Sequence, residues 1–353
     1  MNRDNNVKNN PSKFSNILRK YVHLRQQNGV ITVWLSTLLY SSVLSFSPLA
    51  FSSDNQPHVA PTSEINRTQV CHNVSVQVLG SGGPELDDGR TSSAYLVWVN
   101  GKARVLVDAG SGSSVQFGAS DAAFNDIQAI ALSHLHTDHA ADLPSFIKGS
   151  FFTSRDSDLL VLGPDGNDVM PSTSAYLKAL FGSDGAFRYL SSFLQEGRDK
   201  YTLRPVSVEL SASLKSPYAT DISDNISLEA LSVHHGPIPA LAWKVKANGC
   251  EVVFSGDTSN KDKTLSEFAK SADLLVLHNA IDDNAGGVAK HLHMTPSQLI
   301  AIAQQSKAKQ IVLSHIMKRS EAGLSALTEA ITVVAQGRVY SAKELMNIPL
   351  DQK

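Results

Sequence analysis

The sequence has 353 residues, of which 42% are hydrophobic and 18% are charged, and its formal net charge at pH 7 is −2. This length and apolar fraction are sufficient for a full-sized core, either in one large domain or in two halves. Because positive and negative charges nearly cancel, the net charge of the chain cannot by itself attract nucleic acid or an anionic membrane. Binding to either would require a local basic patch.

The first fifty residues differ from the rest of the chain. A polar, basic segment precedes an apolar segment at residues 30–51, and small residues lie at the end of that segment. This order predicts a signal peptide over residues 1–53 and export to the periplasm. The alternative is a membrane anchor at residues 30–51. A spanning helix needs about 20 predominantly apolar residues, whereas serines, threonines and Pro48 dilute this segment.

After the signal peptide we predict a linker over residues 54–70 and a single folded domain over residues 71–353. The chain has two cysteines, Cys71 and Cys250, and neither has another cysteine nearby at metal-ligand spacing. In an exported protein these two residues either form a disulfide or remain inert buried thiols, and the sequence leaves both alternatives open.

Apolar strand-like segments alternate with helical ones along the mature chain, which predicts an α/β fold. The strand candidates are residues 75–80, 94–99, 103–108, 129–133, 158–163, 251–255, 273–278 and 310–315. The best-marked helix begins after Thr295, because Pro296 suits the first helical position and Gln298 completes a capping box. Further helices are expected within residues 171–194, with breaks at glycines, and at residues 325–335.

Polar residues with metal-binding side chains stand at the ends of four of these apolar strands. They are His134, Asp257, His278 and His315. In open α/β sheets the carboxyl edge of the strands is where ligands bind, because the loops converge there on a rigid sheet. The repeated placement predicts a functional site at that edge.

The segment SHLHTDHAAD at residues 133–142 concentrates these side chains. In an extended chain His134 and His136 point to the same side and can share one metal. If a helix starts at Asp138, that residue and His139 project together toward a second position. Imidazole and carboxylate without thiolate suit zinc, with manganese or iron as alternatives. One loop therefore supplies ligands for two Zn²⁺ ions.

The motif HLHTDH, followed downstream by VHHGPIPA, SGDT and LSH, resembles the metallo-β-lactamase superfamily, and most of all its ribonuclease Z and arylsulfatase-like branch. The segments LGSGGP, LVDAGSG, VLGPDG and HLHMTPSQ extend the resemblance over nearly the whole mature chain. It implies a four-layer αββα sandwich of the α/β class, formed by one hydrolase domain over residues 71–353. The two-metal site would lie at one edge of the paired sheets.

The resemblance also implies which residues bind the metals. The first zinc would be bound by His134, His136 and His235. The second would be bound by Asp138, His139 and His315, and Asp257 would bridge the two ions. Of the two adjacent histidines, His235 is chosen over His234 because the family's H-G-P-x-P-A order begins with the ligand.

Other residues take supporting or catalytic roles by the same resemblance. Asp138 and His293 are the candidate catalytic residues, with His293 as general acid toward the leaving group; the alternative for His293 is a structural role near the helix cap. Asp108 would orient a ligating histidine. His278 matches no ligand position and is expected to support the site.

The implied function is a dinuclear zinc metallohydrolase that cleaves a phosphodiester or a sulfate ester by a metal-bridging hydroxide. One alternative is a lactonase or β-lactamase-type hydrolase, and another is a non-catalytic metal-binding or partner-binding module. The expected partner is a small-molecule ester. Ribonuclease Z enzymes that bind transfer RNA typically carry a protruding basic arm rich in glycine and proline. This sequence contains no such insertion, so we expect no nucleic acid partner. A stable membrane partner is not expected after cleavage, and a homodimer is one alternative for the oligomeric state.

Overall fold

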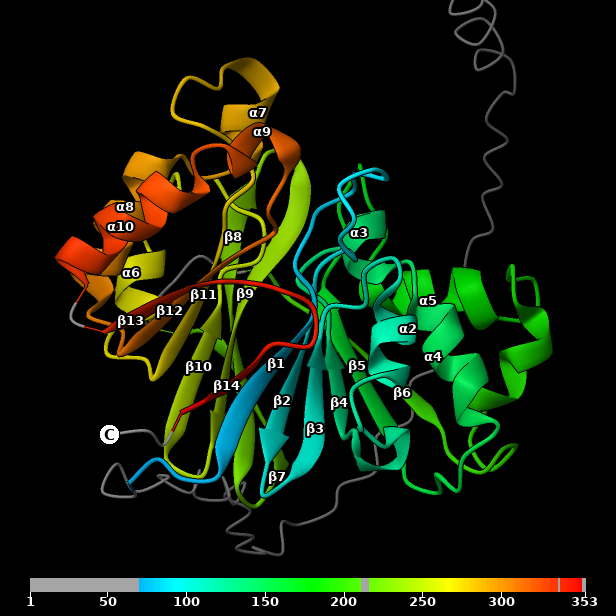
Figure 1. Ribbon diagram of the computed structural model, residues 1–353. Coiled ribbons are helices and arrows are strands. Elements are labelled where there is room, and N and C mark those ends of the chain that lie inside the picture. The colour runs from blue at the N-terminus through cyan, green and yellow to red at the C-terminus, as the bar shows by residue number, and fades with distance from the viewer. Residues whose placement is uncertain (1–69, 211–215, 336, 351–353) are drawn as a thin grey trace, which may run out of the picture. The chain divides into compact units, whose positions relative to one another are not determined.

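The computed structural model describes residues 70–210, 216–335 and 337–350. The predicted signal peptide at residues 1–53 and the linker at residues 54–70, except for its last residue, lie outside this range. The described residues form two sheets of seven strands each, flanked by helices (Figure 1).

The first sheet has the order β14-β1-β2-β3-β4-β5-β6. Its strands are β1 (Val74–Gly80), β2 (Ala94–Val99), β3 (Lys102–Val107), β4 (Ala129–Ala131), β5 (Leu159–Pro164), β6 (Leu203–Val208) and β14 (Asn347–Pro349). Strands β3 to β6 run parallel to one another, and β1 pairs antiparallel with β2 and β14. The carboxyl ends of β3, β4 and β5 therefore meet at one edge.

The second sheet has the order β13-β12-β11-β10-β9-β8-β7. Its strands are β7 (Tyr218–Ser223), β8 (Ile226–His235), β9 (Ile238–Ala247), β10 (Cys250–Phe254), β11 (Leu274–His278), β12 (Gln310–Ser314) and β13 (Arg338–Ser341). Strands β10 to β13 are parallel, whereas β7, β8 and β9 pair antiparallel.

Helices cover the outer face of each sheet and close one edge of the pair. They are α2 (Ser113–Gly118), α3 (Thr137–Ala140), α4 (Leu143–Ser150), α5 (Thr173–Phe181), α6 (Leu265–Phe268), α7 (Gly287–Leu292), α8 (Pro296–Ser306), α9 (Lys318–Glu321) and α10 (Leu324–Val334), with 3-10 turns η2 (Phe124–Asp126) and η3 (Arg188–Leu194). In Figure 1, α2, α4 and α5 lie beside the first sheet, and α6, α8 and α10 lie beside the second. Helices α3, α7 and α9 lie beyond the strand ends at the upper edge.

Alternating side chains on the strands produce three apolar layers. On β2, Tyr95 and Val97 face the core between the two sheets, while Leu96 faces the core under the first sheet's helices. On β11, Val276 faces the core between the sheets and Leu277 faces α8 and α10. Because both faces of these strands are buried, their sequences are apolar throughout. The four-layer αββα prediction is confirmed.

The predicted strands and helices are all found, with small shifts at their ends. Several of the predicted strands extend one or two residues too far at their carboxyl ends, so that Asp108, Ser133, Ser255 and His315 lie beyond the observed strands. Asp108 and His315 have φ of 59° and 52°, a left-handed conformation that lies outside the β region and ends the regular strand. Helix α8 begins as predicted, with Thr295 as its cap and both bonds of the capping box present.

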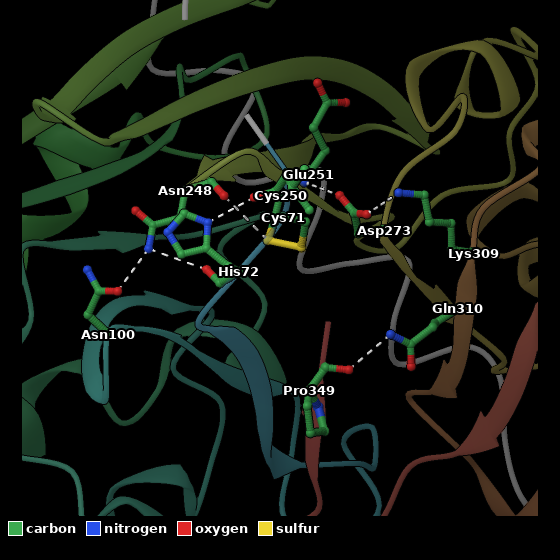
Figure 2. Close-up of a disulfide and its surroundings, with 11 residues drawn as sticks. Cys71, His72, Asn100, Asn248, Cys250, Glu251, Asp273, Lys309, Gln310 and Pro349 are labelled. Atoms are coloured by element: carbon green, nitrogen blue, oxygen red, sulfur yellow. Dashed lines mark hydrogen bonds and ion pairs between the residues drawn. A yellow bond between two sulfur atoms is a disulfide. The ribbon is translucent and has the colours of Figure 1, made fainter. Parts of the chain in front are cut away.

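A disulfide joins Cys71, just before β1, to Cys250 at the start of β10 (Figure 2). The bond links the two sheets at the edge of the core between them, where Asn248 also donates to Asn100 of the first sheet at 3.0 Å. Of the two alternatives for the cysteines, the structure contains the disulfide. Among residues 70–210, 216–335 and 337–350, no helix has the length and hydropathy needed to cross a bilayer.

Candidate metal centre

Loops at the carboxyl ends of strands from both sheets bring the predicted ligands together at one edge. They are His134 and His136 after β4, Asp138 and His139 in α3, His235 at the end of β8, Asp257 after β10, and His315 after β12. Helix α3 begins at Thr137, one residue earlier than the predicted turn at Asp138. All of these side chains are buried except that of His136, which is half-buried.

Two residues of this edge hold the left-handed backbone conformation noted above, Asp108 and His315. Aspartate and histidine tolerate this conformation better than most residues, but it is uncommon outside glycine. Such conformations persist where the surroundings over-determine them, often at functional sites. The LGSGGP loop packs closely against His315. A Cβ on Gly83 would lie only 2.8 Å from Cε1 of His315, so a side chain at this position would displace the ring.

The first group of side chains consists of three histidines, as predicted. His136 Nδ1 lies 3.0 Å from His134 Nε2 and 3.4 Å from His235 Nε2. His235 donates from Nδ1 to the carbonyl oxygen of Leu292 at 2.8 Å, which leaves the Nε2 lone pair facing the group. The three nitrogens can hold one metal ion.

The second group combines histidines with carboxylates. His315 Nε2 lies 3.1 Å from Asp138 Oδ2 and 3.3 Å from Asp257 Oδ2. His139 Nε2 lies 3.5 Å and 3.6 Å from the same two oxygens. Two imidazole nitrogens and two carboxylate oxygens therefore face one another in a buried space.

Asp257 lies between the two groups. Its Oδ2 is 3.9 Å from His235 Nε2 in the first group, in addition to its contacts with His139 and His315 in the second. Its other oxygen, Oδ1, lies 2.8 Å from His278 Nδ1. The second nitrogen of His278 lies 3.2 Å from the Tyr95 hydroxyl, so both of its ring nitrogens have polar partners, and His278 also lies close enough to His139, Asp257 and His315 to form a ligand group with them.

Asp108 fixes His139 from behind. His139 donates from Nδ1 to Asp108 Oδ2 at 2.8 Å, and Ser133 donates to both oxygens of that carboxylate. This arrangement places the proton on Nδ1 and the lone pair on Nε2. His139 Nε2 is buried and has no hydrogen-bond partner in the protein.

The donor set fits a pair of divalent cations. Tetrahedral ligands about 2.1 Å from a zinc ion lie about 3.4 Å from one another. The separations between neighbouring candidate ligand atoms run from 3.0 to 3.9 Å. The buried carboxylates of Asp138 and Asp257 and the unpartnered Nε2 of His139 are costly to bury without an opposite charge or a donor, which a cation would compensate.

The two groups differ in their electrostatics. Burial lowers the pKa of His134, His136 and His235. Burial also opposes the charged form of His139, but Asp108 and the other carboxylates outweigh it and hold its pKa well above the usual value. The first group therefore favours neutral imidazoles. The carboxylates of the second group raise the pKa of both His139 and His315 and so favour positive charge there, which a bound cation would supply in place of the protons.

His293 lies at the margin of the cluster. Its Nδ1 is 3.7 Å from Asp257 Oδ2, is buried and has no hydrogen-bond partner in the protein. Burial lowers the pKa of His293 to about 3, so that its ring is neutral at pH 7. His293 can also complete a ligand group with His235 and Asp257.

A cavity of about 280 Å³ lies outside the cluster, and none of the seven candidate ligands lines it. His234 and Gly236, the sequence neighbours of His235, line it together with Asn167, Ile238 and Asp262. His234 Nδ1 lies 2.9 Å from Ser259 Oγ, a residue outside the cluster. The structure thus separates the two adjacent histidines, with His235 in the cluster and His234 in the cavity wall.

Supporting residues that the sequence did not reveal are Tyr95, Ser133 and Ser314. Tyr95 lies within an apolar strand, where it has the pattern of an ordinary core residue. The two serines precede His134 and His315, but serine is common at strand ends. No sequence signal identifies these three residues, because their contacts come from strands far apart in the chain.

Comparisons with known proteins agree with this geometry. The sequence profile described as "Beta-lactamase superfamily domain" matches residues 103–316. Ribonuclease Z of Mycobacterium sp. (strain KMS) is 27% identical over 268 residues, which are 75% of this chain and 87% of that protein.

Several solved structures share the fold, including one from Bacillus subtilis and one from human. The metallo-β-lactamase fold protein YhfI from Bacillus subtilis has a TM-score of 0.59 and 21% identity, and the match covers 78% of this chain and 98% of that one. The short form of human tRNase Z has a TM-score of 0.57 and 21% identity, with 78% and 99% covered.

Proposed function

Because the chain belongs to the metallo-β-lactamase superfamily, within its ribonuclease Z branch, it is a metal-dependent hydrolase, and we propose that it binds two zinc ions and cleaves a phosphodiester or a sulfate ester. The observation that carries this proposal is the position of Asp257. One of its oxygens faces histidines of both ligand groups, as a residue shared by two cations would.

We assign the ligands accordingly. His134, His136 and His235 would hold one ion, and Asp138, His139 and His315 the other, with Asp257 between them. The absence of cysteine from both groups and the mixture of imidazole and carboxylate favour zinc, with manganese or iron as alternatives. When bound, such a pair of cations lowers the pKa of a shared water and stabilises charge on the attacking and leaving oxygens.

The chain's own residues can also assist the leaving group. His293 lies at the margin of the cluster, with Nδ1 3.7 Å from Asp257 Oδ2, within reach of the leaving group of an ester bound there. Since its ring is neutral before the substrate binds, we propose that the negative charge of the bound ester raises the pKa of His293 and lets it act as general acid.

We also propose that the protein is exported to the periplasm and acts there on a small-molecule ester. The disulfide between Cys71 and Cys250 supports this, since disulfides persist mainly in oxidising compartments. The order of residues 1–53, which is that of a signal peptide, supports it independently. An exported enzyme would have no access to transfer RNA, so we propose no nucleic acid substrate.

The test is metal content and a substrate panel for the purified protein. We expect two metal equivalents and hydrolysis of bis(p-nitrophenyl) phosphate or p-nitrophenyl sulfate. The variant Asp257→Asn should lose metal and turnover by more than the roughly 10–100-fold that a supporting hydrogen bond contributes. Asp273→Asn is the matched control, because Asp273 is also buried but contacts Glu251 and Lys309 at the disulfide end of the sheets (Figure 2).

Three results would contradict the proposal. Two bound metals without hydrolysis of any ester would favour a binding module. Activity confined to lactones or β-lactams would favour the lactonase alternative. An Asp257→Asn protein with both metals and full activity would remove the central ligand assignment.

A further inference from the structure

Beneath the histidine cluster, hydrogen bonds connect the two sheets through fully buried side chains. The hydroxyl of Tyr95 on β2 lies 2.8 Å from Ser314 Oγ on β12 and 3.2 Å from His278 Nε2 on β11, within hydrogen-bonding distance of both. The other ring nitrogen of His278 lies 2.8 Å from Asp257 Oδ1. The exposed fractions of these four side chains are 2% or less.

The ring of Tyr95 is an ordinary core side chain, but its buried hydroxyl must be stabilised by hydrogen bonds. The ring lies in the core between the sheets, with its centroid 5.3 Å from that of Phe254, and phenylalanine would fill that space equally well. Burial of a hydroxyl is unfavourable unless it is hydrogen-bonded. Both of its partners lead directly to the cluster, because Ser314 precedes His315 and His278 contacts Asp257.

This chain of hydrogen bonds controls the orientation of the Asp257 carboxylate. With Oδ1 held by His278, the carboxylate cannot turn without breaking that bond, and Oδ2 stays directed at the two ligand groups. A histidine held at one nitrogen could still swing about its side-chain bonds. The contact between Tyr95 and the second nitrogen of His278 fixes the ring at both ends.

We propose that Tyr95 is a positioning residue of the metal centre, which fixes the ring of His278 and, through it, the orientation of Asp257. The inference rests on the proposed function, in which Asp257 is a ligand shared by two cations. In this proposal a residue on β2 of the first sheet orients Asp257, which follows β10 of the second sheet. The packing of the two sheets against each other therefore affects how tightly the site binds metal.

The test removes one oxygen atom at a time. Tyr95→Phe deletes the hydroxyl that contacts His278, and Tyr201→Phe is the matched control. Tyr201 is also buried, with 3% of its surface exposed, and its hydroxyl lies 2.7 Å from Ser150 Oγ in the core beneath the first sheet's outer helices. The measurements are zinc affinity by chelator competition, the absorption bands of the cobalt-substituted protein, and kcat and KM.

Tyr95→Phe should weaken zinc binding by about 10–100-fold, shift the cobalt bands and lower kcat with little change in KM. Tyr201→Phe should leave all of these at wild-type values, although both variants lower the thermal midpoint. Wild-type zinc affinity and cobalt bands in Tyr95→Phe, or equal losses in Tyr201→Phe, would overturn the proposal.

A double-mutant cycle tests the route through His278. In a His278→Ala background, Tyr95→Phe should cause no further loss of zinc affinity, whereas additive losses would overturn this route. If Tyr95→Phe does not fold, Ser314→Ala removes the other partner of the hydroxyl and should still shift the cobalt bands; unchanged bands would overturn the proposal. A wild-type protein that binds no metal would instead refute the proposed function itself.

Discussion

At the scale of single residues, His139 shows how its surroundings prepare a side chain for metal binding. Asp108 accepts the Nδ1 proton, and the unpartnered Nε2 faces two other carboxylates. The proton position on an imidazole is set by the hydrogen bond at its other nitrogen. Asp108 therefore selects the ring form in which His139 can bind a cation.

Replacing this carboxylate tests that reading. In Asp108→Asn, the amide oxygen can keep the bond from the Ser133 N–H, which places the amide NH₂ opposite His139 Nδ1. The histidine proton would then move to Nε2 and block metal binding, so we expect metal affinity to fall by about 10–100-fold. Isothermal titration with zinc measures this, and Asp273→Asn is the control. Unchanged affinity would contradict the role of Asp108.

The adjacent histidines provide a second residue-scale prediction. His235→Ala should lose one metal equivalent and nearly all activity, because Nε2 of His235 lies 3.4 Å from His136 Nδ1. His234→Ala should keep both metals, because its ring contacts Ser259 instead. Metal analysis of the two purified variants decides between them. Loss of metal from His234→Ala alone would reverse the assignment.

The seven candidate ligands could be predicted because they follow apolar strands and match a family motif. His278 matches no ligand motif, and in the structure both of its ring nitrogens have polar partners. Tyr95 could not be predicted, because its role depends on the distance between two sheets. The neutral state of His293 could not be predicted either, since burial is a property of the folded chain.

At the scale of elements, the start of helix α8 is the boundary that the local sequence predicts best. Thr295 Oγ1 accepts from the N–H of Gln298, and the Gln298 side chain accepts from the N–H of Thr295. These contacts are local, so the sequence alone predicts them. Thr295 also follows closely on His293, the C-cap residue of α7.

Thr295→Ala should lower the free energy of unfolding by about 1 kcal/mol, because it leaves an N-terminal N–H of α8 without its acceptor. Urea denaturation measures the change. Thr295→Ser keeps the hydroxyl and is the control, for which we expect a much smaller loss. Equal losses in the two variants would show that the methyl group of Thr295, and not the cap, stabilises the helix.

The sequence does not predict the strands β6, β7, β8, β9, β13 and β14, and all of them except β8 have a feature that weakens the strand pattern. β7 is an edge strand whose residues are half-buried or exposed, so it lacks an apolar pattern. β6 contains Pro205, and β9 contains Pro239, which are features that argue against a strand in a single sequence. β13 and β14 are short and lie at the outer edges of their sheets. Tertiary pairing, which local sequence does not encode, determines these elements.

At the scale of the whole molecule, the disulfide joins the two sheets over a sequence separation of 179 residues. Closing so long a loop restricts the unfolded chain, so its loss should cost about 2–5 kcal/mol of stability. We expect the double variant Cys71→Ser/Cys250→Ser to melt at a lower temperature than the oxidised wild type. Reduction of the wild type should give the same shift, and a reductant without effect on the melting temperature would contradict this prediction.

Export gives the second prediction at this scale. Protein recovered from the periplasm should begin near residue 54 and contain no free thiol. Intact-mass spectrometry and thiol titration measure both properties. A chain that retains Met1 in membrane fractions would support the anchor at residues 30–51 instead.

The central claim is that seven side chains from both sheets enclose two cations that share Asp257. The most direct measurement is anomalous diffraction at the zinc absorption edge from crystals of the zinc-loaded protein. The account predicts two peaks, one among His134, His136 and His235 and the other among Asp138, His139 and His315, with Asp257 in contact with both. A single peak, or peaks away from these residues, would contradict it.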